Sequence, residues 1–186
     1  MDKIIKTDLK ALFSDERKRR GIEKYADILR AFPTVDVSSD KEFQKKFNGF
    51  YRVRRNAEWQ KAYYFIMERG KTTPLTFESV LTELYTSLGR VEASFTSKLV
   101  HTLYNDMPIW DRFVLENLGL KMPICKGEKK LQTAILLYNQ IVKWYDNALA
   151  TPEIQQKLME FDELFPAYKR FSKTKKLDFL LWQIRE

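Results

Sequence analysis

Apolar side chains recur at steps of three and four residues along most of this sequence. In the stretch LQTAILLYNQIVKWYDNAL, residues 131–149, one stripe collects Leu131, Ile135, Tyr138, Val142 and Tyr145. A stripe with this period buries one face of an α-helix and leaves the other face to water. Because similar patterns fill the rest of the chain, we expect a fold built almost wholly from helices.

Glycine and proline are few, six of each, and stand mostly between the periodic stretches, where they mark helix ends. Only TVDVSS alternates as a strand would, and it is too short to found a sheet. The sequence therefore predicts an all-α fold, a compact array of about nine or ten short helices. We expect a single domain over residues 1–186, arranged as two lobes around a cleft, with a lobe junction near residues 70–75. Helices are expected over residues 3–13, 24–33, 38–53, 57–70, 76–89, 94–104, 110–120, 131–149, 151–166 and 173–186, and a basic turn over residues 16–21.

The charge balance favours a polyanionic partner. The net charge is +8 and the isoelectric point is near 9.4. Each lysine or arginine placed near a phosphate releases a condensed counterion, so a chain of this charge suits nucleic acid, with DNA as the first candidate. Many basic proteins bind no polyanion, so charge alone leaves this open.

The single cysteine, Cys125, excludes an intrachain disulfide and a cysteine-based metal site. A lone thiol is typical of a reducing cytoplasm. No apolar run approaches the ~18 residues of a membrane span, and the N-terminus lacks the apolar core of a signal peptide. The sequence thus predicts a soluble cytoplasmic protein with no membrane partner. With one histidine and no phosphate-binding glycine loop, it also predicts no metal and no cofactor.

Two basic clusters could hold a nucleic-acid backbone. ERKRRG carries four cations at residues 17–20, and FYRVRRNAEWQK carries Arg52, Arg54 and Arg55 among aromatic residues. Arginine pairs bidentately with phosphate, and neighbouring aromatic rings stack on exposed bases. The alternative is a solvated helix face whose aromatic residues turn into the core.

The stretch SFTSKLVHTLYNDMPIWD, residues 94–111, carries the strongest chemical signal. Ser94 is the expected N-cap of a helix that holds Lys98 in its first turns, and the hydroxyls of Ser94, Thr96 and Ser97 could bind a phosphate there. A helix N-terminus and partial burial both lower the pKa of a lysine, as a nucleophilic amine requires. Asp111, after a proline-containing turn, is the expected N-cap of the next helix.

These residues resemble the helix-hairpin-helix DNA glycosylases, the group that contains endonuclease III and 8-oxoguanine DNA glycosylase. The resemblance covers roughly residues 76–120 and implies a hairpin that grips a DNA phosphate, with Lys98 as the nucleophile that attacks the sugar C1′ and Asp111 as its electrostatic partner. The hairpin glycines of that family are replaced here by Ser94 and Thr96, and the lysine and aspartate are closer in sequence than in the family. Parts of the chain also resemble a group of uncharacterised bacterial proteins.

Two functions remain in competition. One is a DNA-binding protein that excises a base from a flipped nucleotide through Lys98 and Asp111, with Arg52, Arg54, Arg55, residues 94, 96 and 97, and His101 contacting the nucleic acid. The other is a non-catalytic helical module that binds nucleic acid or an acidic protein partner. In that case Lys98 is a surface lysine, Asp111 only a helix cap, and His101 a residue of the core edge or surface.

Overall fold

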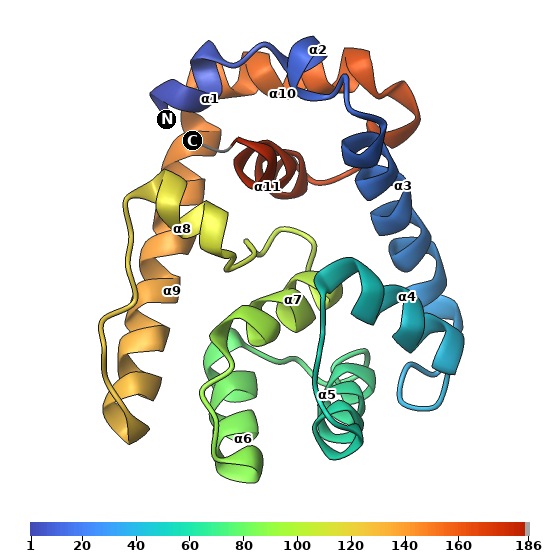
Figure 1. The fold of residues 1–186 in the computed structure, drawn as a ribbon, viewed down its shortest axis with the longest axis vertical. Coiled ribbons are helices and arrows are strands. Elements are labelled where there is room, and N and C mark those ends of the chain that lie inside the picture. Colours follow the sequence, from blue (N-terminus) through green and yellow to red (C-terminus); the bar gives the residue numbers. More distant parts are fainter. Residues whose placement is uncertain (185–186) are drawn as a thin grey trace.

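The computed structural model describes residues 1–184, which are all-α and contain no strand (Figure 1). The α-helices are α1 (Asp2–Lys6), α2 (Leu9–Leu12), α3 (Glu16–Ala31), α4 (Lys41–Tyr51), α5 (Ala57–Arg69), α6 (Phe77–Leu88), α7 (Ala93–Leu103), α8 (Arg112–Leu118), α9 (Gly127–Ala150), α10 (Pro152–Leu164) and α11 (Lys173–Gln183). Two short 3₁₀ turns, η1 (Phe32–Thr34) and η2 (Pro166–Tyr168), follow α3 and α10. The predicted fold class is confirmed.

Helix α11 lies at the centre of the upper half of the molecule as drawn (Figure 1). It is surrounded by α10 above, α3 on one side, and α8 and α9 on the other. Nine of its eleven residues are buried, including the charged side chains of Lys175, Lys176 and Asp178. A helix buried on all sides must pair its charged groups internally, because ions are costly to remove from water. The position of α11 therefore decides where buried charge can occur.

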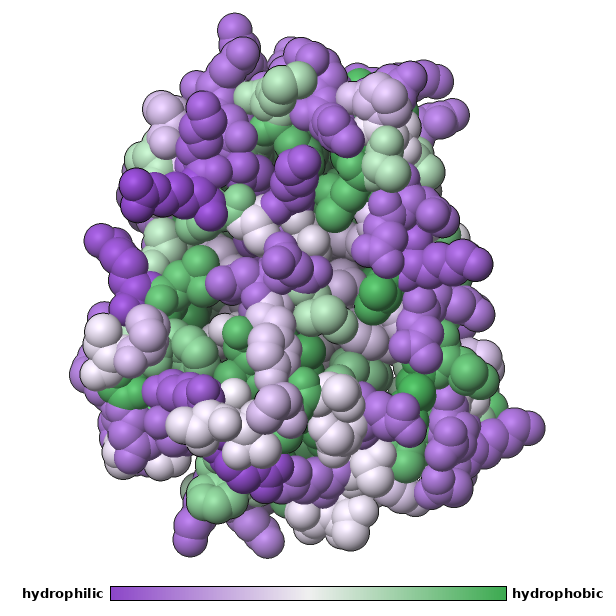
Figure 2. Space-filling model, turned by 180° about the vertical axis from the view of Figure 1, so that it is seen from behind, coloured by the Kyte–Doolittle hydropathy of each residue, from purple (hydrophilic) through white to green (hydrophobic). Residues whose placement is uncertain are grey.

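One continuous hydrophobic cluster runs through all eleven helices of the described residues. The segment near residues 70–75 connects α5 to α6, and these two helices pack against each other. The division into lobes stays a prediction. Figure 2 shows one face of the molecule covered mainly by hydrophilic side chains, with small hydrophobic patches between them. Within residues 1–184, no helix has the length and apolar character needed to cross a membrane.

Several helix ends follow the expected local chemistry. The carboxylate of Asp40 accepts from the backbone N–H of Phe43 at the start of α4, as is typical of an aspartate N-cap. Thr76 and Ser79 form a reciprocal capping box at the start of α6. Gly89 ends that helix in the left-handed region, with φ of 65°, which glycine adopts at little cost. These local signals made α4 and α6 predictable.

The N-terminal region differs from the prediction in two places. The single helix expected over residues 3–13 is divided into α1 and α2, because Asp8 caps a new helix by accepting from the N–H groups of Lys10 and Ala11. The basic stretch 16–21 is not a turn but the first part of α3. Asp15 caps α3 through the N–H of Arg17, and Gly21 continues the helix.

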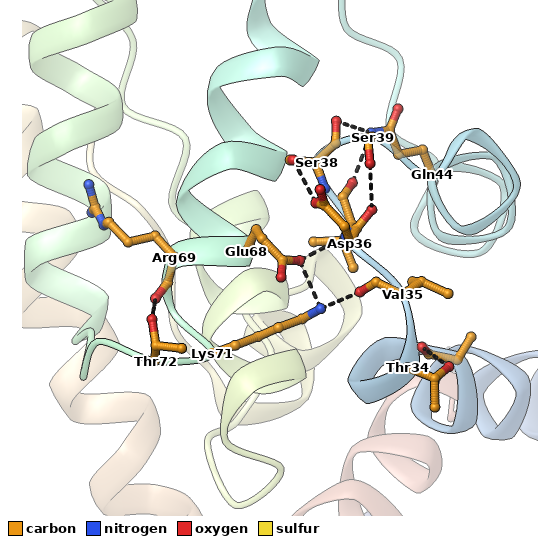
Figure 3. Close-up of polar contacts among 12 residues, drawn as sticks. Thr34, Val35, Asp36, Ser38, Ser39, Gln44, Glu68, Arg69, Lys71 and Thr72 are labelled. Carbon is orange, nitrogen blue, oxygen red and sulfur yellow. Dashed lines mark hydrogen bonds and ion pairs between the residues drawn. The ribbon is translucent and has the colours of Figure 1, made fainter.

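The alternating segment 34–39 forms no strand. Thr34 ends η1, and residues 35–39 form a loop held against the end of α5 (Figure 3). The Glu68 carboxylate accepts from the backbone N–H of Val37 at 2.8 Å and from the Lys71 ammonium at 2.8 Å. Lys71 also donates to the backbone carbonyl of Val35. The side chains of Glu68, in α5, and Lys71, just after it, thus satisfy backbone groups that a sheet would otherwise have paired.

Candidate active site

Helices α6 and α7 form the expected helical hairpin, joined by residues 89–92. The predicted N-cap Ser94 is wrong, because α7 begins earlier and its N-cap is Glu92. Glu92 does not cap the helix through its side chain. Its buried carboxylate instead accepts two hydrogen bonds from the guanidinium of Arg55, at 3.1 and 3.0 Å, and lies 3.3 Å from that of Arg90. Because an acid of the chain itself occupies this position, the hairpin differs from a free phosphate site.

Lys98 is buried in the second turn of α7, with 8% of its surface exposed. Its ammonium donates to the hydroxyl of Ser94 at 3.0 Å and lies 5.0 Å from the ring centre of Phe95. Burial lowers the pKa of Lys98 from 10.5 to about 8, and the negative charge of Asp111 partly opposes that change. The neutral fraction of this amine at physiological pH is therefore far larger than that of an ordinary lysine, although the charged form still predominates.

Asp111 is the N-cap of α8, as predicted, and one of its carboxylate oxygens accepts from the N–H of Phe113 at 2.9 Å. The turn before it is tied to α7, because the backbone N–H of Trp110 donates to the buried hydroxyl of Ser97 at 2.8 Å. This bond spans thirteen residues and holds the entry to α8 against the helix that carries Lys98. Ser97 thus fixes the turn and is not available as a phosphate donor.

Lys98 and Asp111 line one small cavity of about 70 Å³. Two further charged residues, Lys175 and Asp178 of α11, line the same cavity, so two ammonium groups and two carboxylates meet there. This second pair was not among the site residues predicted from the sequence. The signal in the sequence is a lysine and an aspartate three residues apart, just before the apolar run FLLW at residues 179–182. The rest of the lining is apolar, aromatic or arginine: Phe50, Tyr51, Arg52, Ile109, Phe113 and Trp182.

The second pair is fully internal. The ammonium of Lys175 lies 2.8 Å from a carboxylate oxygen of Asp178, and the hydroxyl of Tyr145 donates to the other oxygen at 3.2 Å. The same ammonium lies 4.3 Å from the ring centre of Tyr25 and 4.6 Å from that of Phe179. Burial lowers the pKa of Lys175 and raises that of Asp178, while the attraction between their charges opposes both changes. The positive charge of Lys175 further lowers the pKa of Lys98.

His101 is part of the core, and its side chain is fully buried. One ring nitrogen, Nδ1, is 2.6 Å from the carbonyl oxygen of Met107, so it carries the proton and donates. Nε2 then accepts from the hydroxyl of Tyr25 at 2.8 Å. Burial lowers the pKa of His101 to about 3, so the ring is neutral. The expected contacts of His101, Thr96 and Ser97 with nucleic acid are corrected, because the side chains of all three are inaccessible.

The three arginines expected on the backbone do not share one surface. Arg52 lines the small cavity, whereas Arg54 and Arg55 line a separate hollow beside Trp59. Arg55 is committed to Glu92 in a bidentate ion pair. Of the three, only Arg52 lines the cavity that holds Lys98, and its charge also lowers the pKa of that lysine.

A larger cleft of about 690 Å³ adjoins the small cavity and shares Phe50, Arg52 and Trp182 with it. Its other walls come from α3, from the segment around α2 and from the end of α11. Within residues 1–184, no group of three or more histidine, cysteine, aspartate or glutamate side chains is arranged to hold a metal ion.

Comparison with known protein families, curated proteins and solved structures gives no significant match to this chain.

Proposed function

We propose that this protein binds DNA and cleaves an N-glycosidic bond, with Lys98 as the nucleophile and Asp111 as its electrostatic partner. The observation that carries the proposal is the shared cavity. It holds a buried amine whose pKa is near 8 together with a partly exposed carboxylate, and it adjoins a cleft lined with cations. An amine with a lowered pKa beside a carboxylate, in a recess next to a basic surface, is the arrangement that nucleophilic excision needs.

The chemistry follows the roles that the family resemblance implies. Neutral Lys98 attacks the sugar C1′, forming a C–N bond, and the base leaves with the electron pair of the broken glycosidic bond and takes the proton that the attacking nitrogen loses. Ring opening, with protonation of the ring oxygen, then gives a Schiff base. The carboxylate of Asp111 stabilises the positive charge that develops on the sugar. Lys175 favours the neutral form of the nucleophile, as a neighbouring cation does for other amine nucleophiles.

The proposal requires the cavity to open. A volume of about 70 Å³ holds a few water molecules and is too small for a nucleobase. Trp182 lines both the cavity and the cleft, and part of its side chain is exposed. We expect displacement of this ring to join the two spaces when a flipped nucleotide enters, with binding energy from the cleft offsetting the cost of unstacking.

Borohydride trapping tests the nucleophile directly. The wild-type protein, Lys98→Met and the control Lys46→Met, at an exposed lysine of α4, are each incubated with DNA that carries an abasic site and then reduced. Hydride addition to the Schiff base leaves a stable secondary amine between protein and DNA. We expect the covalent product with wild type and the control, and its loss with Lys98→Met.

Base release is measured in parallel, because a glycosylase that forms no Schiff base escapes trapping. Asp111→Asn keeps the shape of the side chain and removes its charge, so release should fall steeply in this variant. Salt-sensitive DNA binding with neither trapping nor base release, unchanged by Lys98→Met, would refute the enzyme and leave the non-catalytic module.

A further inference from the structure

Three residues of the large cleft depart from what helix stability favours. Gly21 lies inside α3 and Gly49 inside α4, where glycine is less favourable than alanine. A Cβ atom added at either glycine would meet no other atom within 4 Å, so packing does not require glycine there. Arg52 ends α4 with φ of 55°, in the left-handed region that glycine adopts more easily than arginine. All three positions line the same cleft.

Departures of this kind gather where function outweighs stability. Glycines with open space above them keep two helix surfaces bare, so a ligand can approach the backbone closely. The arginine at the end of α4 places a cation at the boundary between the cleft and the small cavity. The cleft is thus wider and more positive than a stability-optimised α3–α4 pair would make it.

The remaining lining combines cations with an aromatic ring. Lys18 and Lys24 of α3 join Arg52, and within residues 1–184 none of the three makes an ion pair; Arg17 is held by Asp15. Trp182, part of which is exposed, stands at the inner end beside Phe50. Cations that track a phosphate chain, together with aromatic rings that stack on bases, are the pattern of single-strand binding sites.

We propose that this cleft is a track for single-stranded nucleic acid, which leads a displaced strand past Gly21 and Gly49 to Arg52 and Trp182. This inference extends the proposed function. It rests on that function only for what happens to the strand once it reaches Lys98. A recess enclosed by α3, α4 and α11 suits a single phosphate chain with splayed bases, whereas a duplex needs a broad, open surface.

Substitutions that fill the cleft without lowering the stability of the fold test whether single-stranded nucleic acid binds there. Leucine is a strong helix former, and its Cβ would enter open space, so Gly21→Leu and Gly49→Leu should keep or raise the Tm, by about 1–4 °C where they raise it. Binding of a fluorescein-labelled oligothymidine, measured by fluorescence anisotropy, should weaken about tenfold or more in each variant. Loss of affinity without loss of stability cannot come from unfolding.

Arg52→Gly tests whether the charge of Arg52 contributes to binding in the cleft. Removing the left-handed arginine should raise the Tm, and the lost phosphate contact should reduce the slope of log affinity against log salt by about 0.7. Lys46→Gln, at an exposed lysine of α4 that does not line the cleft, should leave the slope unchanged.

The outcomes separate this inference from the proposed function. Absence of base release in a wild-type protein that binds the oligothymidine would refute the chemistry alone. Wild-type affinity in both leucine variants would overturn the track. So would tighter binding of a matched duplex than of the single strand, or no binding of the single strand by wild type.

Discussion

Replacing the proposed nucleophile should make the protein more stable. Lys98→Met keeps the length and apolar stem of the side chain and removes its charge. Lowering the pKa of Lys98 from 10.5 to about 8 corresponds to about 3 kcal/mol, at about 1.4 kcal/mol for each unit of pKa. That is the free energy by which the charged lysine destabilises the folded state near neutral pH. We expect Lys98→Met to raise the free energy of unfolding by about 2–3 kcal/mol and the Tm by about 4–12 °C.

The stabilisation should depend on pH with a definite sign. Because the folded-state pKa of Lys98 lies below its unfolded value, the unfolded chain binds more protons between about pH 8 and 10.5. The contribution of Lys98 to the free energy of unfolding of the wild type therefore increases as the pH rises through this window. Urea unfolding of both proteins from about pH 6 to 10.5 should show a difference that is largest below pH 8 and nearly gone at the top. Taking the difference cancels the other titrating groups that the two proteins share.

Lys46→Met is the matched control, because Lys46 is exposed on α4 and the same atoms are changed in water. Its effect should stay within about 0.5 kcal/mol at every pH. A Lys98→Met protein less stable than wild type near neutral pH, or a difference that does not vary with pH, would show that the ammonium of Lys98 is well accommodated and would remove the basis for a reactive amine.

Three further outcomes follow from the same cavity and its surroundings. The His101 ring protons should not titrate in NMR spectra down to about pH 4. Because the folded-state pKa of His101, about 3, lies below its ordinary value of 6.5, this residue should lower the free energy of unfolding progressively as the pH falls below 6.5. Lys175→Met should destabilise the fold by about 3–5 kcal/mol in urea unfolding, because it leaves Asp178 buried without its ion partner, and the double variant with Asp178→Leu should recover most of the loss. Asp111→Ala should cost about 1 kcal/mol through the lost helix cap and lower the pKa of Lys98 further, which NMR of labelled lysines can measure.

The fold class was predictable because the signals for helices are local. Three- and four-residue periodicity, the capping box at Thr76 and the stop at Gly89 each act within one or two turns. The errors arose where one cap outweighed periodicity. Asp8 divides a helix whose apolar pattern is continuous, and Asp15 extends α3 through a stretch whose basic residues and glycine favoured a turn. A cap is one side chain, and nothing in the sequence states which of several candidates will be used.

The site was predictable in part for the same reason. The cap role of Asp111 is local, and the hairpin that carries Lys98 follows from two neighbouring helices. The partnership with Lys175 and Asp178 depends on α11 packing against α8, across more than fifty residues of sequence. His101 was misplaced because its two partners, Tyr25 and the Met107 carbonyl, come from a distant helix and a turn. Long-range packing decides which polar residues are buried, and periodicity does not record it.

The two buried lysines of the cavity make opposite contributions, and the contrast argues for function at only one of them. Lys175 has a fully buried carboxylate at 2.8 Å, so the pair forms a neutral unit whose halves need each other. Lys98 has a hydroxyl at 3.0 Å and a carboxylate already engaged as a helix cap, so its charge is poorly compensated. A methionine at position 98 would remove this cost, whereas the same change at position 175 would add one. The neighbouring cleft also contains residues that lower stability, at Gly21, Gly49 and Arg52. A reactive site requires this combination, in which an amine is held near an acid at a cost to the stability of the fold.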